Sequence, residues 1–326
     1  MNSSWTGDPV LTDVVRETTG LLDRRFLLNA LLPTLITLGL LGTVVAGTLT
    51  DPATALRAWN ALDGTIKVLA GTGVVVVAVL IAAIVSGAAQ TITRCYEGLW
   101  PGRLGHILLL PGRHRHRRRA RRLGFERGAA DYPVDPADVL PTRLGNILRA
   151  AESYPADRYG ADAVLTWPRL FPLLPDKLTA SLASARAELE FQVMISAHAA
   201  FFAVAAGGWL AVTGGPPWLF LTCYWSAAAL AWATYRGALA PARLYGDQVR
   251  VAFDLYRHEL LDRLGMDGDE QWARLNQFWH RNIPLGTPLL PKSDDRPAVK
   301  ALPSVSLSVL AWFLLIGSGL LVVWLR

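Results

Sequence analysis

Cysteine and lysine are scarce in this chain, and the common motifs of enzyme active sites are missing. Two cysteines, Cys95 and Cys223, occur in 326 residues, which is too few for a disulfide framework or a cysteine-based metal site. There is no glycine-rich phosphate loop and no Gly-x-Ser-x-Gly elbow. We therefore expect a protein that is not an enzyme and that uses no metal or cofactor.

Apolar residues, in contrast, are abundant and are gathered in long segments. Hydrophobic residues make up 52% of the chain, and five apolar segments lie at 26–49, 68–89, 192–212, 218–239 and 303–325. About 20 such residues cross the hydrocarbon core of a bilayer as one helix. The expected fold is all-α: a polytopic integral membrane protein with five transmembrane helices, arranged as two hairpins and a C-terminal helix, and a discontinuous helical cytoplasmic module.

Positive charge, carried by 28 arginines and only four lysines, is distributed unevenly between these segments. Segment 1–25 holds three Lys and Arg residues, segment 90–191 holds 16 and segment 236–303 holds ten. The segments that would lie on the other side of the membrane hold only Arg57, Lys67 and Arg326. Cytoplasmic loops carry the excess of basic residues in membrane proteins. The sequence therefore predicts a multi-pass protein of the cell inner (plasma) membrane, with a cytoplasmic N-terminus and an extracytoplasmic C-terminus.

The same reasoning divides the chain into six parts. These are a cytoplasmic tail (1–25), a first hairpin (26–89), a cytoplasmic region (90–191), a second hairpin (192–239), amphipathic cytoplasmic helices with a linker (240–302) and a fifth transmembrane helix (303–326). The first helix of the second hairpin is expected to begin near residue 176, because no proline or glycine interrupts 176–206. Apolar periodicity predicts further helices over 140–152, 243–264 and 269–281, and the rest of 133–175 reads as an ordered loop.

The segment 113–127, a basic run, has the highest density of charged residues in the chain. Its candidate contacts for anionic lipid headgroups are Arg113, Arg115, Arg117, Arg118, Arg119, Arg121 and Arg122. A basic residue near an anionic leaflet contributes about 1 kcal/mol to membrane binding, and a solvated positive anchor would use the same residues. Nucleic-acid binding is not expected, because the run lacks interleaved aromatic residues and a recognised fold.

Inside the predicted spans, His198 is the one side chain expected to titrate near neutral pH. It is a candidate pore-lining or proton-sensitive residue, or a structural hydrogen-bonding group. Stripes of small residues, Ala78–Ala82–Ser86 and Ala199–Ala203–Gly207, indicate close helix packing within the chain or between copies. We expect a non-enzymatic multi-pass membrane protein whose cytoplasmic helical module binds a protein partner or mediates self-assembly into a homo-oligomer. The alternative is an oligomeric ion channel or pore.

Overall fold

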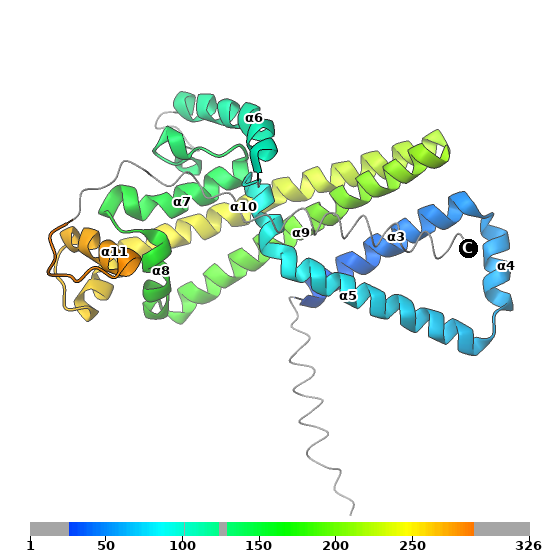
Figure 1. The fold of residues 1–326 in the computed structure, drawn as a ribbon, viewed down its shortest axis with the longest axis horizontal. Helices are drawn as coiled ribbons and strands as arrows, with labels where there is room; N and C mark the ends of the chain where they lie inside the picture. The colour runs from blue at the N-terminus through cyan, green and yellow to red at the C-terminus, as the bar shows by residue number, and fades with distance from the viewer. Residues whose placement is uncertain (1–25, 101, 124–128, 290–326) are drawn as a thin grey trace, which may run out of the picture. The chain divides into compact units, whose positions relative to one another are not determined.

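The computed structural model describes residues 26–100, 102–123 and 129–289 (Figure 1). Within these residues every regular element is helical and no strand occurs, so the all-α prediction is confirmed. The longer helices are α3 (Leu32–Leu49), α4 (Pro52–Ala61), α5 (Gly64–Glu97), α6 (Gly102–Leu123), α7 (Arg143–Tyr159), α8 (Ala163–Leu170), α9 (Asp176–Thr213), α10 (Pro217–Arg263) and α11 (Trp272–Arg281). A π-helical turn, η1 (Leu27–Leu31), precedes α3, and short 3-10 turns are η2 (Ala129–Asp131), η3 (Pro136–Asp138), η4 (Phe171–Leu173) and η5 (Asp269–Gln271).

Three of these helical segments are long and apolar enough to cross a membrane. They are Leu27–Leu49, which joins η1 to α3, then α5 and α9. In α5 only 17% of the most apolar stretch is buried, and side chains such as Val68 and Leu69 are more than two-thirds exposed (70% and 73%). Apolar side chains left exposed along a whole helix are what a lipid environment would cover.

The other two predicted spans are not among these three helices. The fourth lies in α10, which contains Trp218, Tyr224, Trp225 and Trp232, and these residues are less apolar than the valine and leucine of α5. α10 is accordingly not among the three apolar helices of the described residues, and its span stays a prediction. The fifth predicted span, 303–325, lies outside the described residues.

The chain divides into two compact units. Within the described residues the first unit contains 26–89 and 194–234, and the second contains 90–193 and 235–289 apart from the gaps given above. Helices α5, α9 and α10 each contribute one part to each unit. The assignment of these units to membrane hairpins and to a cytoplasmic module stays a prediction.

In the first unit, polar contacts and small side chains join α3, α9 and α10. The Trp209 indole N–H donates to Thr48 Oγ1 at 2.8 Å, beside a buried cluster of Val44, Ala206 and Leu210. Gly207 leaves room for Tyr224, because a Cβ at this glycine would lie 3.1 Å from the tyrosine ring. Of the two predicted small-residue stripes, Ala199–Ala203–Gly207 is buried throughout, whereas the stripe on α5 is buried at Ala78 and Ala82 but exposed at Ser86.

The second unit is built around the C-terminal half of α10. Leu144 and Ile147 of α7 pack against a stretch of small and aliphatic residues on α10, namely Ala238, Leu239 and Ala242. Further along α10, Phe253 is fully buried with Trp272 of α11 and with Leu170 and Leu182. Each such side chain contributes about 1.5–3 kcal/mol on burial. These contacts hold α7, α8, α9 and α11 against one helix (Figure 1).

Local predictions for this unit are partly confirmed and partly wrong. The helices expected over 140–152, 176–212 and 269–281 correspond to α7, α9 and η5 with α11. Residues expected to be loop within 133–175 include helix α8, because the Asp162 side chain caps it by accepting hydrogen bonds from the backbone N–H groups of Val164 and Leu165. The helix expected to begin at 243 is not separate either, since α10 continues through Pro241.

Candidate functional site

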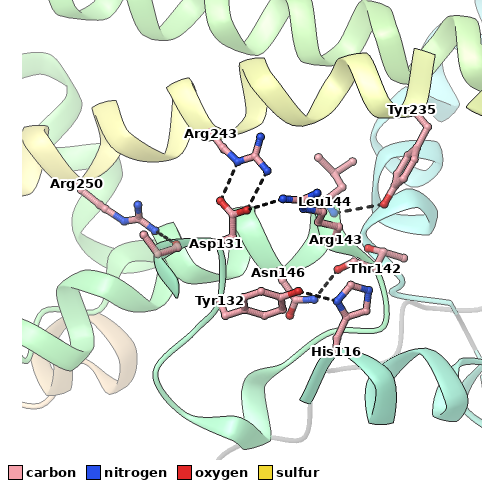
Figure 2. A network of polar contacts seen from close by, with 11 residues as sticks. His116, Asp131, Tyr132, Thr142, Arg143, Leu144, Asn146, Tyr235, Arg243 and Arg250 are labelled. Carbon is pink, nitrogen blue, oxygen red and sulfur yellow. Dashed lines mark hydrogen bonds and ion pairs between the residues drawn. The ribbon is translucent and has the colours of Figure 1, made fainter. Parts of the chain in front are cut away.

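A buried carboxylate, Asp131, is the centre of a polar network in the second unit (Figure 2). Its Oδ1 accepts from Nε of Arg243 at 2.9 Å, and its Oδ2 accepts from Nη2 of the same arginine at 2.9 Å. Arg143 of α7 donates to Oδ2 at 3.3 Å. One carboxylate therefore joins η2, α7 and α10. Asp131 and Arg243 are 112 residues apart in the sequence.

The charge state of Asp131 follows from these contacts. Burial alone would raise the pKa of this carboxyl, but the hydrogen bond from Arg243 and the positive charges of Arg243 and Arg143 lower it below the ordinary value. The carboxylate is therefore ionised at neutral pH and fully engaged by two guanidinium groups. Such a group holds elements together and has no free proton to exchange in a reaction.

The surrounding residues fasten the segment 129–142 in the same way. Asn146 brackets Leu140 by accepting from its N–H and donating to its C=O, both at 2.8 Å. His116 of α6 lies 3.0 Å from the Tyr132 hydroxyl (Figure 2). Burial, followed by the charges of neighbouring arginines, lowers the pKa of His116, so the neutral imidazole can accept from the tyrosine at neutral pH. Arg250 adds a bond to the carbonyl of Ala130 at 2.7 Å.

The basic run lies on α6, and the structure separates its arginines into two groups. Nε of Arg113 donates to the carbonyl of Val139 at 3.2 Å, and Nε of Arg117 donates to the carbonyl of Pro136 at 2.9 Å. These two of the predicted lipid contacts therefore fasten α6 to its own unit. The other five are exposed and form no ion pair with a described acidic residue: Arg115, Arg118, Arg119, Arg121 and Arg122. We call these five the α6 basic face.

His198 lies in the first unit between α3 and α9. Its Nδ1 is 2.8 Å from the carbonyl of Met194, and its Nε2 is 3.2 Å from Oγ1 of Thr34. A neutral imidazole protonated on Nδ1 satisfies both contacts, since Nε2 can then accept from the threonine hydroxyl. This geometry suits a structural role, and the pore-lining role stays a prediction.

A second carboxylate, Asp254 of α10, is held by two tyrosines of α7. The Tyr154 hydroxyl donates to it at 2.9 and 3.1 Å, and the Tyr159 hydroxyl donates at 2.6 Å. Burial and the hydrogen bond to Asp254 raise the pKa of Tyr154 to about 12. Arg257 lies over the Tyr159 ring, 4.0 Å from its centroid. These contacts lock α7 onto α10.

A cavity of about 550 Å³ lies within the second unit, and α5, α7, α8, α9 and α10 all contribute to its wall. Charged lining residues include Arg94, Glu97 and Arg186, and aromatic ones include Trp167 and Phe253. Sequence reasoning missed this cavity, because its residues come mostly from five different helices and are spread along the chain from Arg94 to Phe253. The only signal was the presence of Arg94 and Glu97 just after an apolar segment.

Among the described residues, no group of three or more His, Cys, Asp and Glu side chains could hold a metal ion. Comparison with known proteins finds no matching family model, no matching curated protein and no matching solved structure. The site must therefore be interpreted from its own geometry and charge.

Proposed function

We propose that this chain is a non-enzymatic, multi-pass protein of the plasma membrane whose second unit is a cytoplasmic docking module. In this proposal the N-terminus is cytoplasmic and the C-terminus extracytoplasmic. Three apolar helices support the membrane location, and the arginine-rich segments support the orientation. The module holds itself against anionic headgroups and presents its remaining surface to a protein partner or to a second copy of the chain.

The observation that carries this proposal is the α6 basic face. Arg113 and Arg117 are used to fasten α6, but the five arginines of the face have no acidic partner within the described residues. A cluster of like charges that has no acidic partner among the described residues of its unit fits an anionic surface. At about 1 kcal/mol for each residue near the leaflet, five arginines would supply at most about 5 kcal/mol, and salt would weaken the contact.

The position of α6 in the chain supports the same partner. Only four residues separate the end of α5 at Glu97 from the start of α6 at Gly102. Because α5 is one of the three apolar helices, this short connection keeps the start of α6 close to the membrane surface that α5 would reach. In this proposal, a leaflet rich in anionic lipid is therefore the acidic surface that lies closest to α6.

The test compares lipid retention by matched variants of the full chain. One variant replaces Arg115, Arg118 and Arg122 of the α6 basic face with Gln, and the control variant replaces the exposed Arg263, Arg274 and Arg281. Both lose three positive charges from arginines that the proposal places in the cytoplasm. In nanodiscs of mixed phosphatidylglycerol and phosphatidylcholine, native mass spectrometry would count retained anionic lipids. We expect fewer retained phosphatidylglycerol molecules for the α6 variant alone, and equal retention in the two variants would contradict the proposal.

Docking of a protein partner or a second copy has its own test. The detergent-solubilised full chain, cross-linked in its native membrane and then purified, should carry a second copy or a stoichiometric partner. Repeated recovery of a bare monomer would contradict that part of the proposal.

An oligomeric channel is the alternative proposal, motivated by His198 and by the buried small-residue stripe on α9. We rank it second because both ring nitrogens of His198 have partners within the first unit. Planar-bilayer recording from a verified oligomer between about pH 5 and 8, where histidine changes its charge, would decide. A histidine-dependent conductance would overturn the ranking.

A further inference from the structure

The cavity of the second unit has the size of a small-molecule site. Its volume of about 550 Å³ falls within the range of roughly 300–1,000 Å³ that is usual for ligand pockets. Residues far apart in the sequence meet around it, from Arg94 at the end of α5 to Phe253 in α10. A space this large with both charged and apolar walls suits an organic ligand better than a few isolated waters.

The charged part of the lining includes one arginine, Arg94, that has no ion-pair partner among the described residues. Three arginines, Arg94, Arg149 and Arg186, face two glutamates, Glu97 and Glu152. Arg149 is paired with Glu152 at 3.0 Å and with Asp138 at 3.2 Å, and Arg186 is paired with Glu190 at 2.6 Å. Asp138 and Glu190 lie outside the lining.

The arginines also retain unused hydrogen-bonding capacity. Nε of Arg149 is buried and has no hydrogen-bond partner within the described residues. A guanidinium carries five N–H donors, so Arg94 and Arg186 can still bind an oxyanion in a planar, two-pronged manner. The lining therefore offers donors and positive charge to an acidic group.

Glu97 is the residue that could oppose an anion, and its burial reduces its negative charge near neutral pH. The apolar part of α5 ends at Ala89, so Glu97 lies about 12 Å further along the helix and outside the membrane-spanning segment. Burial raises its pKa to about 7, against the opposing effects of Arg186 and Arg94 and with a smaller rise from Glu152. When protonated, Glu97 becomes a hydrogen-bond donor instead of a negative charge.

The rest of the lining is apolar. The rings of Trp167 and Phe253 lie 5.9 Å apart between centroids, and Leu148 and Val249 add aliphatic surface. Aromatic and aliphatic walls of this kind bind the hydrocarbon part of a ligand, while a few polar groups fix its orientation.

The geometry points to a binding site for an amphiphilic anion, with its acidic group held by Arg94 and Arg186 and its hydrocarbon part against Trp167 and Leu148. This site is separate from the α6 basic face and does not depend on it. An amphiphilic anion could reach the cavity as a free molecule or as the headgroup region of an anionic lipid, and the experiment below distinguishes the two sources.

The test uses the full chain in nanodiscs and follows its thermal unfolding with octanoate as the probe. Because a ligand that binds only the folded state stabilises it, octanoate in neutral phosphatidylcholine nanodiscs should raise the unfolding temperature. Octan-1-ol has the same hydrocarbon chain without the charge and should raise it far less. A second arm uses phosphatidylglycerol nanodiscs without octanoate. If the unfolding temperature there is higher than in phosphatidylcholine nanodiscs, and Arg94→Gln removes this difference, the lipid is the source of the anion.

Two variants and one control make the result specific. Arg94→Gln should weaken octanoate binding by at least about tenfold, whereas Arg274→Gln, an exposed arginine on α11 outside the cavity, should leave it unchanged. Wild-type binding should weaken by about tenfold from pH 6 to pH 8 as Glu97 loses its proton. Glu97→Gln, which keeps a neutral donor, should bind octanoate equally at both pH values.

The unfolding temperature without probe reports whether each variant is folded. If Arg94→Gln fails to fold, the pH dependence and its loss in Glu97→Gln decide the question. The proposal is overturned if octanol stabilises the protein as much as octanoate does. It is also overturned if folded Arg94→Gln responds like the wild type in both lipid arms, or if Glu97→Gln loses binding.

Discussion

Replacement of Asp131 by Asn tests the polar network that joins η2, α7 and α10. The Asp131 side chain is only 10% exposed, whereas Arg143 and Arg243 are 29% and 38% exposed. Removing one partner of a fully buried ion pair costs about 3–5 kcal/mol, and an exposed pair contributes at most about 1 kcal/mol. Because this network is intermediate in burial and Asn keeps one acceptor oxygen, we expect a loss of about 2 kcal/mol.

Hydrogen exchange, followed by mass spectrometry on the full chain in nanodiscs, measures this loss where it should occur. A loss of about 2 kcal/mol corresponds to roughly 30-fold faster exchange in peptides of α7 and the segment 129–142. Asp247→Asn is the matched control, because Asp247 pairs with Arg250 on the same helix but its side chain is 66% exposed. The control should change exchange by less than about threefold.

Two results would refute this reasoning: equal exchange in the two variants, or wild-type exchange in Asp131→Asn. The pH dependence provides a further check. The folded-state pKa of Asp131 lies below the unfolded value of about 3.9. Its stabilisation is therefore fully present above that value and is lost as the pH falls through the folded-state pKa. Between pH 5 and 8 we expect no change from this group, and Asp131→Asn should lack the acid-induced loss.

Two further substitutions probe packing in the second unit. Gly145→Ala should destabilise the protein by about 1–3 kcal/mol, because a Cβ there would collide with the carbonyl oxygen of Glu97. Thermal unfolding measures this loss. The control is Gly42→Ala, which adds a methyl group in open space on α3 and should be neutral or stabilising. Thr166→Val should be neutral or stabilise by about 1 kcal/mol, because the buried Thr166 Oγ1 has no hydrogen-bond partner among the described residues. A clear loss of stability in Thr166→Val would reveal a partner for that hydroxyl.

The helices of this fold could be predicted where a single local signal determines them. Uninterrupted segments without proline or glycine predict α9, and apolar periodicity predicts α7 and α11. Helix α8 was missed because Trp167–Pro168 suggests a loop, whereas the capping carboxylate of Asp162 and burial of Leu170 stabilise a helix there. Pro241 likewise suggested a break in α10, but the helix continues through it.

The site was less predictable than the fold, since its residues meet only after folding. The basic run was visible in the sequence, but the use of Arg113 and Arg117 as fastening residues depends on carbonyl groups of the segment 129–142. Asp131 and Arg243 are 112 residues apart, and nothing in either local sequence marks them as partners. Glu97 owes its raised pKa to burial beneath helices that a linear reading cannot position.

The central claim is that the second unit, which carries the α6 basic face, lies on the cytoplasmic side of the membrane. Cysteine accessibility tests this most directly. In a full chain with Cys95 and Cys223 replaced by Ser, single cysteines would replace Asp63, before the predicted second span, and Arg121 of α6, both of which are exposed. A membrane-impermeant maleimide should label Asp63→Cys in intact cells, and Arg121→Cys only after the membrane is opened. Labelling of both positions from the same side, or of Arg121→Cys in intact cells, would contradict the account.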